Sequence, residues 1–405
     1  MTIFSPTREA ALQHLDDFTP QMGQAYAAQR NYDRGPGKHT SVSGLSPFIR
    51  RRLISEQEVV TAALQNHGLD GAEKFIQEVF WRGYFKGWLE RRPAIWESYQ
   101  QGLATDLEDL EKNSGLRQAV TRAEAGQTGI DCFDAWVDEL VHTGYLHNHA
   151  RMWFASIWIF TLKLPWRIGA DFFYRHLLDG DPASNTLSWR WVAGLHTRGK
   201  TYEAQAWNIA KFTGGRFAPE SSDFETGVTS LDWSEPNGLP SAQPTRDFAA
   251  PEPGKATALL LTEDDCLPET LIPDGIEFVA TATLTSSDLR SPRPVPDHIR
   301  SFEAGALEDA AQRIGQAATR LNTASPAPII EWAAEAGAKQ IVMPYVPAGP
   351  LKDWLDASRP KLENHGLTLT EIRRPWDDAI WRYATAGFFK VKKEIPNILN
   401  RLEIA

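Results

Sequence analysis

The segment from Asp179 to Trp191 brings together residue types that can bind a polar aromatic ligand. It places two carboxylates, an amide and two indoles within about four helical turns. Acidic side chains are usually exposed and indoles usually are not, so this mixture favours a polar cleft in aromatic surroundings. The alternative is structural, because Asp181 before Pro182 is typical of a helix cap followed by the first helical residue.

Further short blocks precede this segment in the chain. Together with the Asp179–Trp191 segment, the blocks in chain order are Tyr26–Asn31, Ser43–Pro47, Glu78–Arg82, Gly126–Gly129, Gly144–Met152 and Asp179–Trp191. The last block, Asp-Gly-Asp-Pro-Ala-Ser-Asn followed by Trp-Arg-Trp, is similar to the flavin-binding signature of the photolyase/cryptochrome family. Each motif alone is weak, but their shared order over residues 1 to about 217 argues against chance matches.

The resemblance implies bound FAD, whose diphosphate needs donors that approach closely. Ser43 and Ser46 supply hydroxyls, Gly44 allows close approach of the backbone, and Pro47 suits the first turn of a following helix. An ordinary helix start is the alternative. The residues expected to contact this part of the cofactor are Tyr26, Ser43, Gly44, Leu45, Ser46 and Arg82.

The isoalloxazine ring needs polar partners at its edge. By resemblance, Asp181 faces the pyrimidine side of the ring and Asn185 lies by the flavin N5 nitrogen. Arg151 and Asp179 are expected to form an ion pair packed against the ring. A structural salt bridge is the alternative for that pair, and both interpretations can hold.

Two tryptophans match the family's electron relay. Trp189 stands at the first relay position and Trp166 at the second, whereas the third position falls near residues 112–115, which contain no tryptophan. The chain has fifteen tryptophans, so core packing is the alternative for any one of them.

The resemblance also implies a pocket for a pyrimidine dimer flipped out of DNA. In dimer-repairing relatives two tryptophans enclose the lesion, while a glutamate and an asparagine bond to its bases. The expected catalytic residues are Glu78, Trp81, Asn148, Met152, Asn185 and Trp191. Asn148 favours cyclobutane dimers. The implied function is their light-driven repair, by electron transfer from excited reduced FAD.

Two departures from the family pattern point to weaker and more salt-sensitive DNA binding. His149 stands where the family has an arginine, and residues 203–208 lack a second one. The net charge of −10 acts in the same direction. The basic runs at 50–52 and 91–92 are either a local basic face or solvated helix ends.

Composition narrows the class of protein. Two cysteines far apart in sequence, Cys132 and Cys266, cannot hold an iron–sulfur cluster and fit a reducing cytoplasm. The N-terminus has no signal-peptide pattern. Residues 152–162 are apolar but bounded by charges, so we expect a buried helix rather than a membrane span.

The pattern predicts an α+β chain of two domains. A mostly helical FAD-binding domain is expected at 1–217, a linker at 218–254, a smaller α/β domain with a parallel, Rossmann-like sheet at 255–375 and a helical tail at 376–405. In that α/β domain and at its edges, expected strands are 258–261, 276–280, 340–343 and 367–372, and expected helices are 307–321, 329–336 and 351–365.

The α/β region has a weaker resemblance to the antenna domain that normally precedes the flavin domain. Residues 386–390 are similar to the Phe-Thr-Pro-Phe-Lys at that domain's exit, whereas residues 260–265 lack its usual opening motif. We expect an antenna-like domain moved to the C-terminus, with no motif for a second chromophore. Two alternatives stay open: a cryptochrome-like photoreceptor, and a protein-interaction role for residues 255–375.

Overall fold

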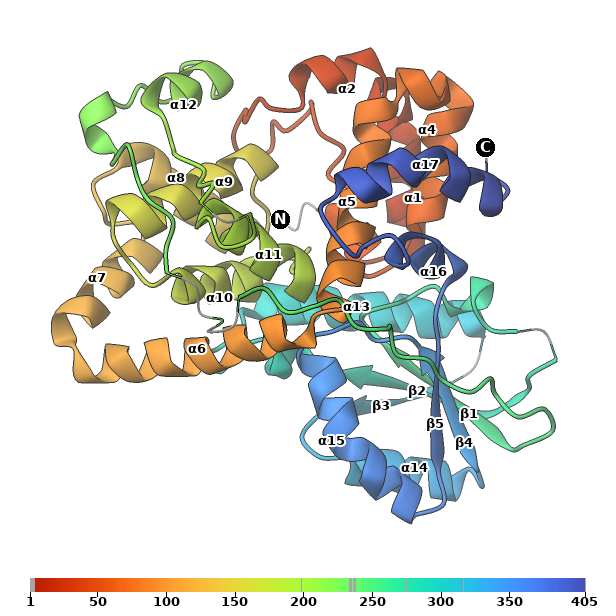
Figure 1. Ribbon diagram of the computed structural model, residues 1–405. Coiled ribbons are helices and arrows are strands. Elements are labelled where there is room, and N and C mark those ends of the chain that lie inside the picture. Colours follow the sequence, from red (N-terminus) through yellow and green to blue (C-terminus); the bar gives the residue numbers. More distant parts are fainter. Residues whose placement is uncertain are drawn as a thin grey trace. The chain divides into compact units, whose positions relative to one another are not determined.

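The computed structural model describes residues 4–197, 199–232, 235, 238–273, 275–315 and 317–404. The described chain is mostly helical, with one five-stranded sheet formed by its C-terminal part (Figure 1). The helices are α1 (Arg8–Phe18), α2 (Gln24–Gln29), α3 (Ser46–Arg50), α4 (Glu56–Gly71), α5 (Glu73–Glu90), α6 (Pro93–Lys112), α7 (Ser114–Glu124), α8 (Asp131–Thr143), α9 (Asn148–Ser156), α10 (Trp166–His176), α11 (Pro182–Val192), α12 (Ala206–Phe212), α13 (Asp297–Ile314), α14 (Ala327–Glu335), α15 (Pro350–Asn364), α16 (Pro375–Trp381) and α17 (Phe389–Arg401). The strands are β1 (Thr257–Thr262), β2 (Phe278–Thr285), β3 (Ala318–Asn322), β4 (Gln340–Pro344) and β5 (Thr368–Ile372).

The chain forms two compact units, each assembled from separate stretches of sequence. The first unit holds Gln24–Gly44 and Arg92–Ser241. The second unit holds Phe4–Gly23, Leu45–Arg91 and the chain from Ala242 onward. These units follow packing rather than chain order, so the domain limits expected at 217, 254 and 375 stay a prediction.

The sheet of the second unit is entirely parallel, in the order β3-β2-β1-β4-β5. Helices α13, α14 and α15 connect successive strands from β2 to β5. The central strand β1 is buried along its whole length, as expected where helices cover both faces of a parallel sheet. The predicted parallel sheet with covering helices is confirmed.

One predicted element in this region is wrong. A helix was expected over 307–321, but α13 ends at Ile314 and residues 318–322 form the edge strand β3. Gly315 ends the helix in the left-handed conformation, with φ of 73°, which a glycine adopts without a Cβ clash. The expected strand at 276–280 also starts later, since β2 runs from Phe278 to Thr285.

The basic run at 50–52 is buried in the second unit. Arg50 bonds Asp264 at 2.5 Å, Arg51 pairs with Glu303 at 2.6 Å, and Arg52 makes two bonds to Asp377 at 2.7 and 2.8 Å. These three arginines are 1–3% exposed. Both sequence interpretations, a basic face and solvated helix ends, are therefore wrong for this run.

The apolar stretch at 152–162 is a buried helix, as predicted. It covers the end of α9 and continues as a π-helical turn, Ile157–Thr161. Within the described ranges, no helix is long and apolar enough to cross a membrane.

Helices α5 and α16 pack closely in the second unit because glycines face the contact. A Cβ on Gly87 would lie 2.5 Å from Cδ1 of Trp381 and 3.0 Å from its Cα. We expect Gly87→Ala to lower the free energy of unfolding by about 1–3 kcal/mol, since overpacking forces the helices apart. Urea denaturation measures this. The control is Gly115→Ala on α7, where a Cβ meets only Asn113 Oδ1 at 3.5 Å. Equal, small changes in both variants would contradict the packing argument.

Candidate functional site

The expected site residues are divided between the two units. Glu78, Trp81 and Arg82 lie on α5 in the second unit, and their spacing places them on one helix face. Most of the others belong to the first unit. Residues 43–46 cross from one unit to the other in sequence.

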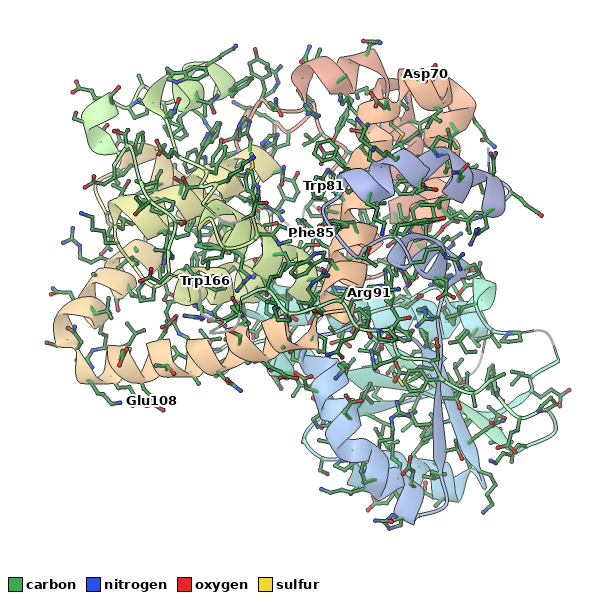
Figure 2. The ribbon with its side chains drawn as sticks, in the orientation of Figure 1. Asp70, Trp81, Phe85, Arg91, Glu108 and Trp166 are labelled. Carbon is green, nitrogen blue, oxygen red and sulfur yellow. The ribbon has the colours of Figure 1, made fainter. Side chains whose placement is uncertain are left out.

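Trp81 has a neighbour that the sequence did not indicate. Its ring stacks on Phe388 with centroids 3.8 Å apart and an interplanar angle of 16°. Phe388 comes from the C-terminal segment, which Tyr84 anchors by donating a hydrogen bond to the carbonyl of Ala386 at 3.0 Å. Trp81 and Phe85 project from neighbouring turns of α5 (Figure 2). One face of Trp81 is therefore covered within its own unit.

The predicted phosphate loop leads into a short helix. Gly44 has φ of 61°, a conformation that favours glycine. Leu45 is buried, Ser46 begins α3, and Pro47 occupies its first turn. The expected helix start is present, and Tyr26 is buried on α2. Contacts with a diphosphate stay a prediction.

Asp181 caps helix α11. Its carboxylate accepts a hydrogen bond from the backbone N–H of Ser184 at 2.8 Å, and Pro182 occupies the first turn. The capping alternative from the sequence is therefore confirmed. The cap fixes where α11 begins and holds Asp181, 3% exposed, at its N-terminus.

Arg151 and Asp179 form the ion pair that the resemblance implied. The guanidinium donates to both carboxylate oxygens, at 3.1 and 3.0 Å, and its Nε donates to the carbonyl of Leu146 at 2.8 Å. Such paired, charge-assisted bonds fix the geometry of both groups. The Asp179 side chain is 3% exposed and that of Arg151 is 22% exposed, so the guanidinium stays partly accessible to a ligand.

Asn185 lies on α11 and is oriented by a backbone carbonyl. Its Nδ2 donates to the carbonyl of Ala170, on α10, at 2.8 Å. Because the amide nitrogen is used in this way, the side-chain oxygen is the group directed elsewhere as an acceptor. The first unit thus brings Arg151, Asp179, Asp181 and Asn185 to the start and first turn of α11.

The two expected relay tryptophans have different surroundings. Trp189 is 2% exposed and meets Phe173 at 5.2 Å and Trp158 at 6.4 Å, edge to face in both cases. Trp166 meets Tyr99 at 5.8 Å, and Tyr99 stacks on Trp96 at 5.3 Å. The sequence did not indicate Tyr99 and Trp96, which form an aromatic row with Trp166.

The remaining expected lesion contacts of the first unit lie on α9 and α11. Asn148 begins α9 and is exposed, Met152 follows one turn later, and the Trp191 ring lies 5.4 Å from that of Tyr202. Tyr202 lines a surface pocket of about 330 Å³ with Trp207, which is 62% exposed. The full lining is Thr201, Tyr202, Glu203, Gln205, Trp207 and Asn208.

His149 does not replace the missing arginine. Its Nδ1 donates to the carbonyl of Asn31 at 3.0 Å, and its Nε2 lies 3.3 Å from the Tyr202 hydroxyl. Burial lowers the pKa of His149 below its ordinary value. A neutral, internally bonded histidine has no charge with which to hold a phosphate.

Comparisons with known proteins identify the central part of the chain. Residues 75–219 match the family described as the FAD binding domain of DNA photolyase. A deoxyribodipyrimidine photo-lyase from Streptomyces griseus is 36% identical over 158 residues, which are 39% of this chain and 33% of that protein. One from Alkalihalophilus pseudofirmus is 31% identical over 202 residues, 48% of this chain and 39% of that protein. The chain thus spans well under half the length of these curated relatives.

Among solved structures, a bacterial class III photolyase from Agrobacterium tumefaciens has 28% sequence identity and a TM-score of 0.43. The match covers 52% of this chain and 44% of that chain.

Proposed function

We propose that this chain, a member of the photolyase/cryptochrome family, binds FAD and repairs cyclobutane pyrimidine dimers in DNA with light. The observation that carries the proposal is the bidentate Arg151–Asp179 pair beside the capped start of α11. Because the geometry of this pair is fixed, it supports the binding of a flavin ring beside the start of α11.

The residues of the first unit fit the ring of a flavin. The partly exposed guanidinium of Arg151 offers a planar cation, and the side-chain oxygen of Asn185 offers an acceptor for the N5–H that a reduced flavin carries. An acceptor at that position favours the reduced state. When bound, FAD supplies the photoexcited electron donor.

Four residues at motif positions are proposed to contact the lesion. Glu78 and Asn148, both exposed, are proposed to bond to the bases, while Trp191 supplies an apolar face and Met152 a flexible contact. These roles rest on the match of the motif positions. No general acid and no metal ion is needed for the splitting of the cyclobutane ring.

A cryptochrome-like photoreceptor is the second candidate, and two observations favour it. His149 is buried and held by Asn31 rather than directed outward, and Phe388 covers one face of Trp81. Both arrangements reduce the number of side chains that are free to contact a lesion. This candidate keeps FAD and its photoreduction but has little affinity for damaged DNA.

Two measurements distinguish these candidates. Dimers in a short DNA duplex should disappear under blue light when the bound flavin is reduced, and lesion-containing DNA should compete better than undamaged DNA for binding at low salt. Photoreduction with equal affinity for both DNAs and no dimer loss would support the photoreceptor instead.

A further inference from the structure

Asp33, His39 and Glu139 form a cluster in the first unit that shares no residue with the proposed flavin and lesion sites. One donor atom of each residue lies within 4.8 Å of the others. Asp33 is fully buried and Glu139 is 2% exposed, whereas the His39 side chain is 11% exposed. His39 therefore leaves a path from solvent to the cluster.

Hydrogen bonding fixes the direction in which the His39 ring offers its lone pair. Nε2 lies 2.6 Å from Oε1 of Glu139. Because a carboxylate oxygen accepts, Nε2 carries a proton, which leaves Nδ1 as the ring atom that can bind a cation. Nδ1 faces Oδ1 of Asp33 at 3.8 Å, beyond hydrogen-bond distance.

The carboxylate of Asp33 retains a lone pair on the same side. Its Oδ2 accepts hydrogen bonds from Trp136 at 2.9 Å and from Arg216 at 2.6 Å. Its Oδ1 accepts one from the backbone N–H of Gly35 at 3.0 Å, which uses one of two lone pairs. Nδ1 of His39 and Oδ1 of Asp33 therefore face each other without a hydrogen bond, and either a proton on Nδ1 or a metal ion between the two atoms would stabilise this arrangement.

The separation of these two atoms suits one metal ion. Ligand atoms at about 2.0–2.2 Å from a zinc-sized ion are separated by at most about 4.4 Å, so 3.8 Å allows both to bind it. Arg216 offsets one of the two carboxylates, and an ion that replaces a proton on Nδ1 would offset the second.

Unpaired polar atoms gather at this place. Among the described residues, His39 Nδ1, Glu139 Oε2 and His147 Nε2 are buried without a hydrogen-bond partner. The His147 ring stacks on that of His39, with centroids 5.6 Å apart. Buried polar atoms are rarely left unpaired, and three in one cluster indicate a bound partner.

We propose that Nδ1 of His39 and Oδ1 of Asp33 bind a divalent first-row transition metal ion of the zinc or manganese type. Glu139, on α8, orients the imidazole through Nε2 and supplies further negative charge, as carboxylates commonly do beside metal-bound histidines. Imidazole nitrogen with carboxylate oxygen favours such an ion over Mg²⁺ or Ca²⁺. The ion would hold the two ends of the loop at 33–39 together, and the hydrogen bond between His39 and Glu139 joins that loop to α8.

Calorimetric titration of the full chain with Zn²⁺, after removal of metals by a chelator, tests this site. We expect one site per chain in the wild type and no measurable site in His39→Gln. Glu139→Gln keeps an acceptor for Nε2 but loses the charge, and should bind about 10–100-fold more weakly. The control is His142→Gln on the same helix, since His142 is an exposed histidine 3.0 Å from Asp138. It should bind Zn²⁺ as the wild type does.

The thermal midpoint provides a second readout. Zn²⁺ should raise it in the wild type and in the His142 variant, and should leave it unchanged in His39→Gln. Equal affinity in all four proteins, or no saturable binding by the wild type, would overturn the proposal. If His39→Gln does not fold, the near-isosteric Glu139→Gln decides: unchanged affinity in that variant also overturns it.

Discussion

Replacing Trp189 by phenylalanine is expected to slow the light-driven reduction of bound FAD at least about tenfold, which corresponds to about 1.4 kcal/mol in barrier height. Phenylalanine is far harder to oxidise than tryptophan, so the variant loses the proposed first electron donor. The fold should tolerate the change. Within the described part of the chain, the buried Nε1 of Trp189 has no hydrogen-bond partner, and Phe173 and Trp158 already pack around its ring.

The matched control for this prediction is Trp158→Phe. Trp158 is as deeply buried as Trp189 and touches its ring, but stands outside the motif. Flavin absorbance followed during blue illumination with an external reductant compares the three proteins. Trp158→Phe should keep most of the wild-type rate. If Trp189→Phe is reduced as fast as the wild type, Trp189 is not the first donor.

Replacing Arg52 by methionine is expected to lower the free energy of unfolding by about 3–5 kcal/mol, because it leaves buried carboxylates without their counter-charge. Arg52 bonds Asp377 twice and also reaches Glu56 and Asp265, each at 3.2 Å. All four side chains are at most 3% exposed. Burial raises the pKa of Asp377, and Arg52 opposes that rise; without Arg52 it would rise further.

Arg320→Met in the same unit is the control. Arg320 pairs with Glu308 at 3.1 Å, but their side chains are 78% and 53% exposed. Exposed pairs of this kind contribute less than about 1 kcal/mol. Urea denaturation of both variants should therefore give clearly different losses. A similar small loss in both would show that the Arg52 cluster contributes little to stability.

Local sequence signals predicted the start of α11 correctly. Asp181 followed by Pro182 specifies a cap and a first turn whatever the rest of the chain does. Family resemblance added the Arg151–Asp179 pair, because the motif holds both positions in register. The parallel sheet was also predictable, since short apolar runs alternate with helical patterns.

Features that depend on distant residues were not predictable. Most of the carboxylates that pair with Arg50–Arg52 lie more than two hundred positions away in sequence, so the run of arginines alone resembled a surface segment. Phe388 meets Trp81 across most of the chain length. The cluster of Asp33, His39 and Glu139 has no compact motif, because its residues lie on a loop and on α8.

The most direct test of the central claim is dimer repair by the fully reduced protein under blue light. The substrate is a short DNA carrying one cyclobutane thymine dimer, in excess over protein and at low salt. Thymine absorbance should recover over several turnovers in the light, not at all in the dark, and much more slowly with Trp191→Ala. Reduced, FAD-loaded protein that leaves every dimer intact after prolonged illumination would contradict it.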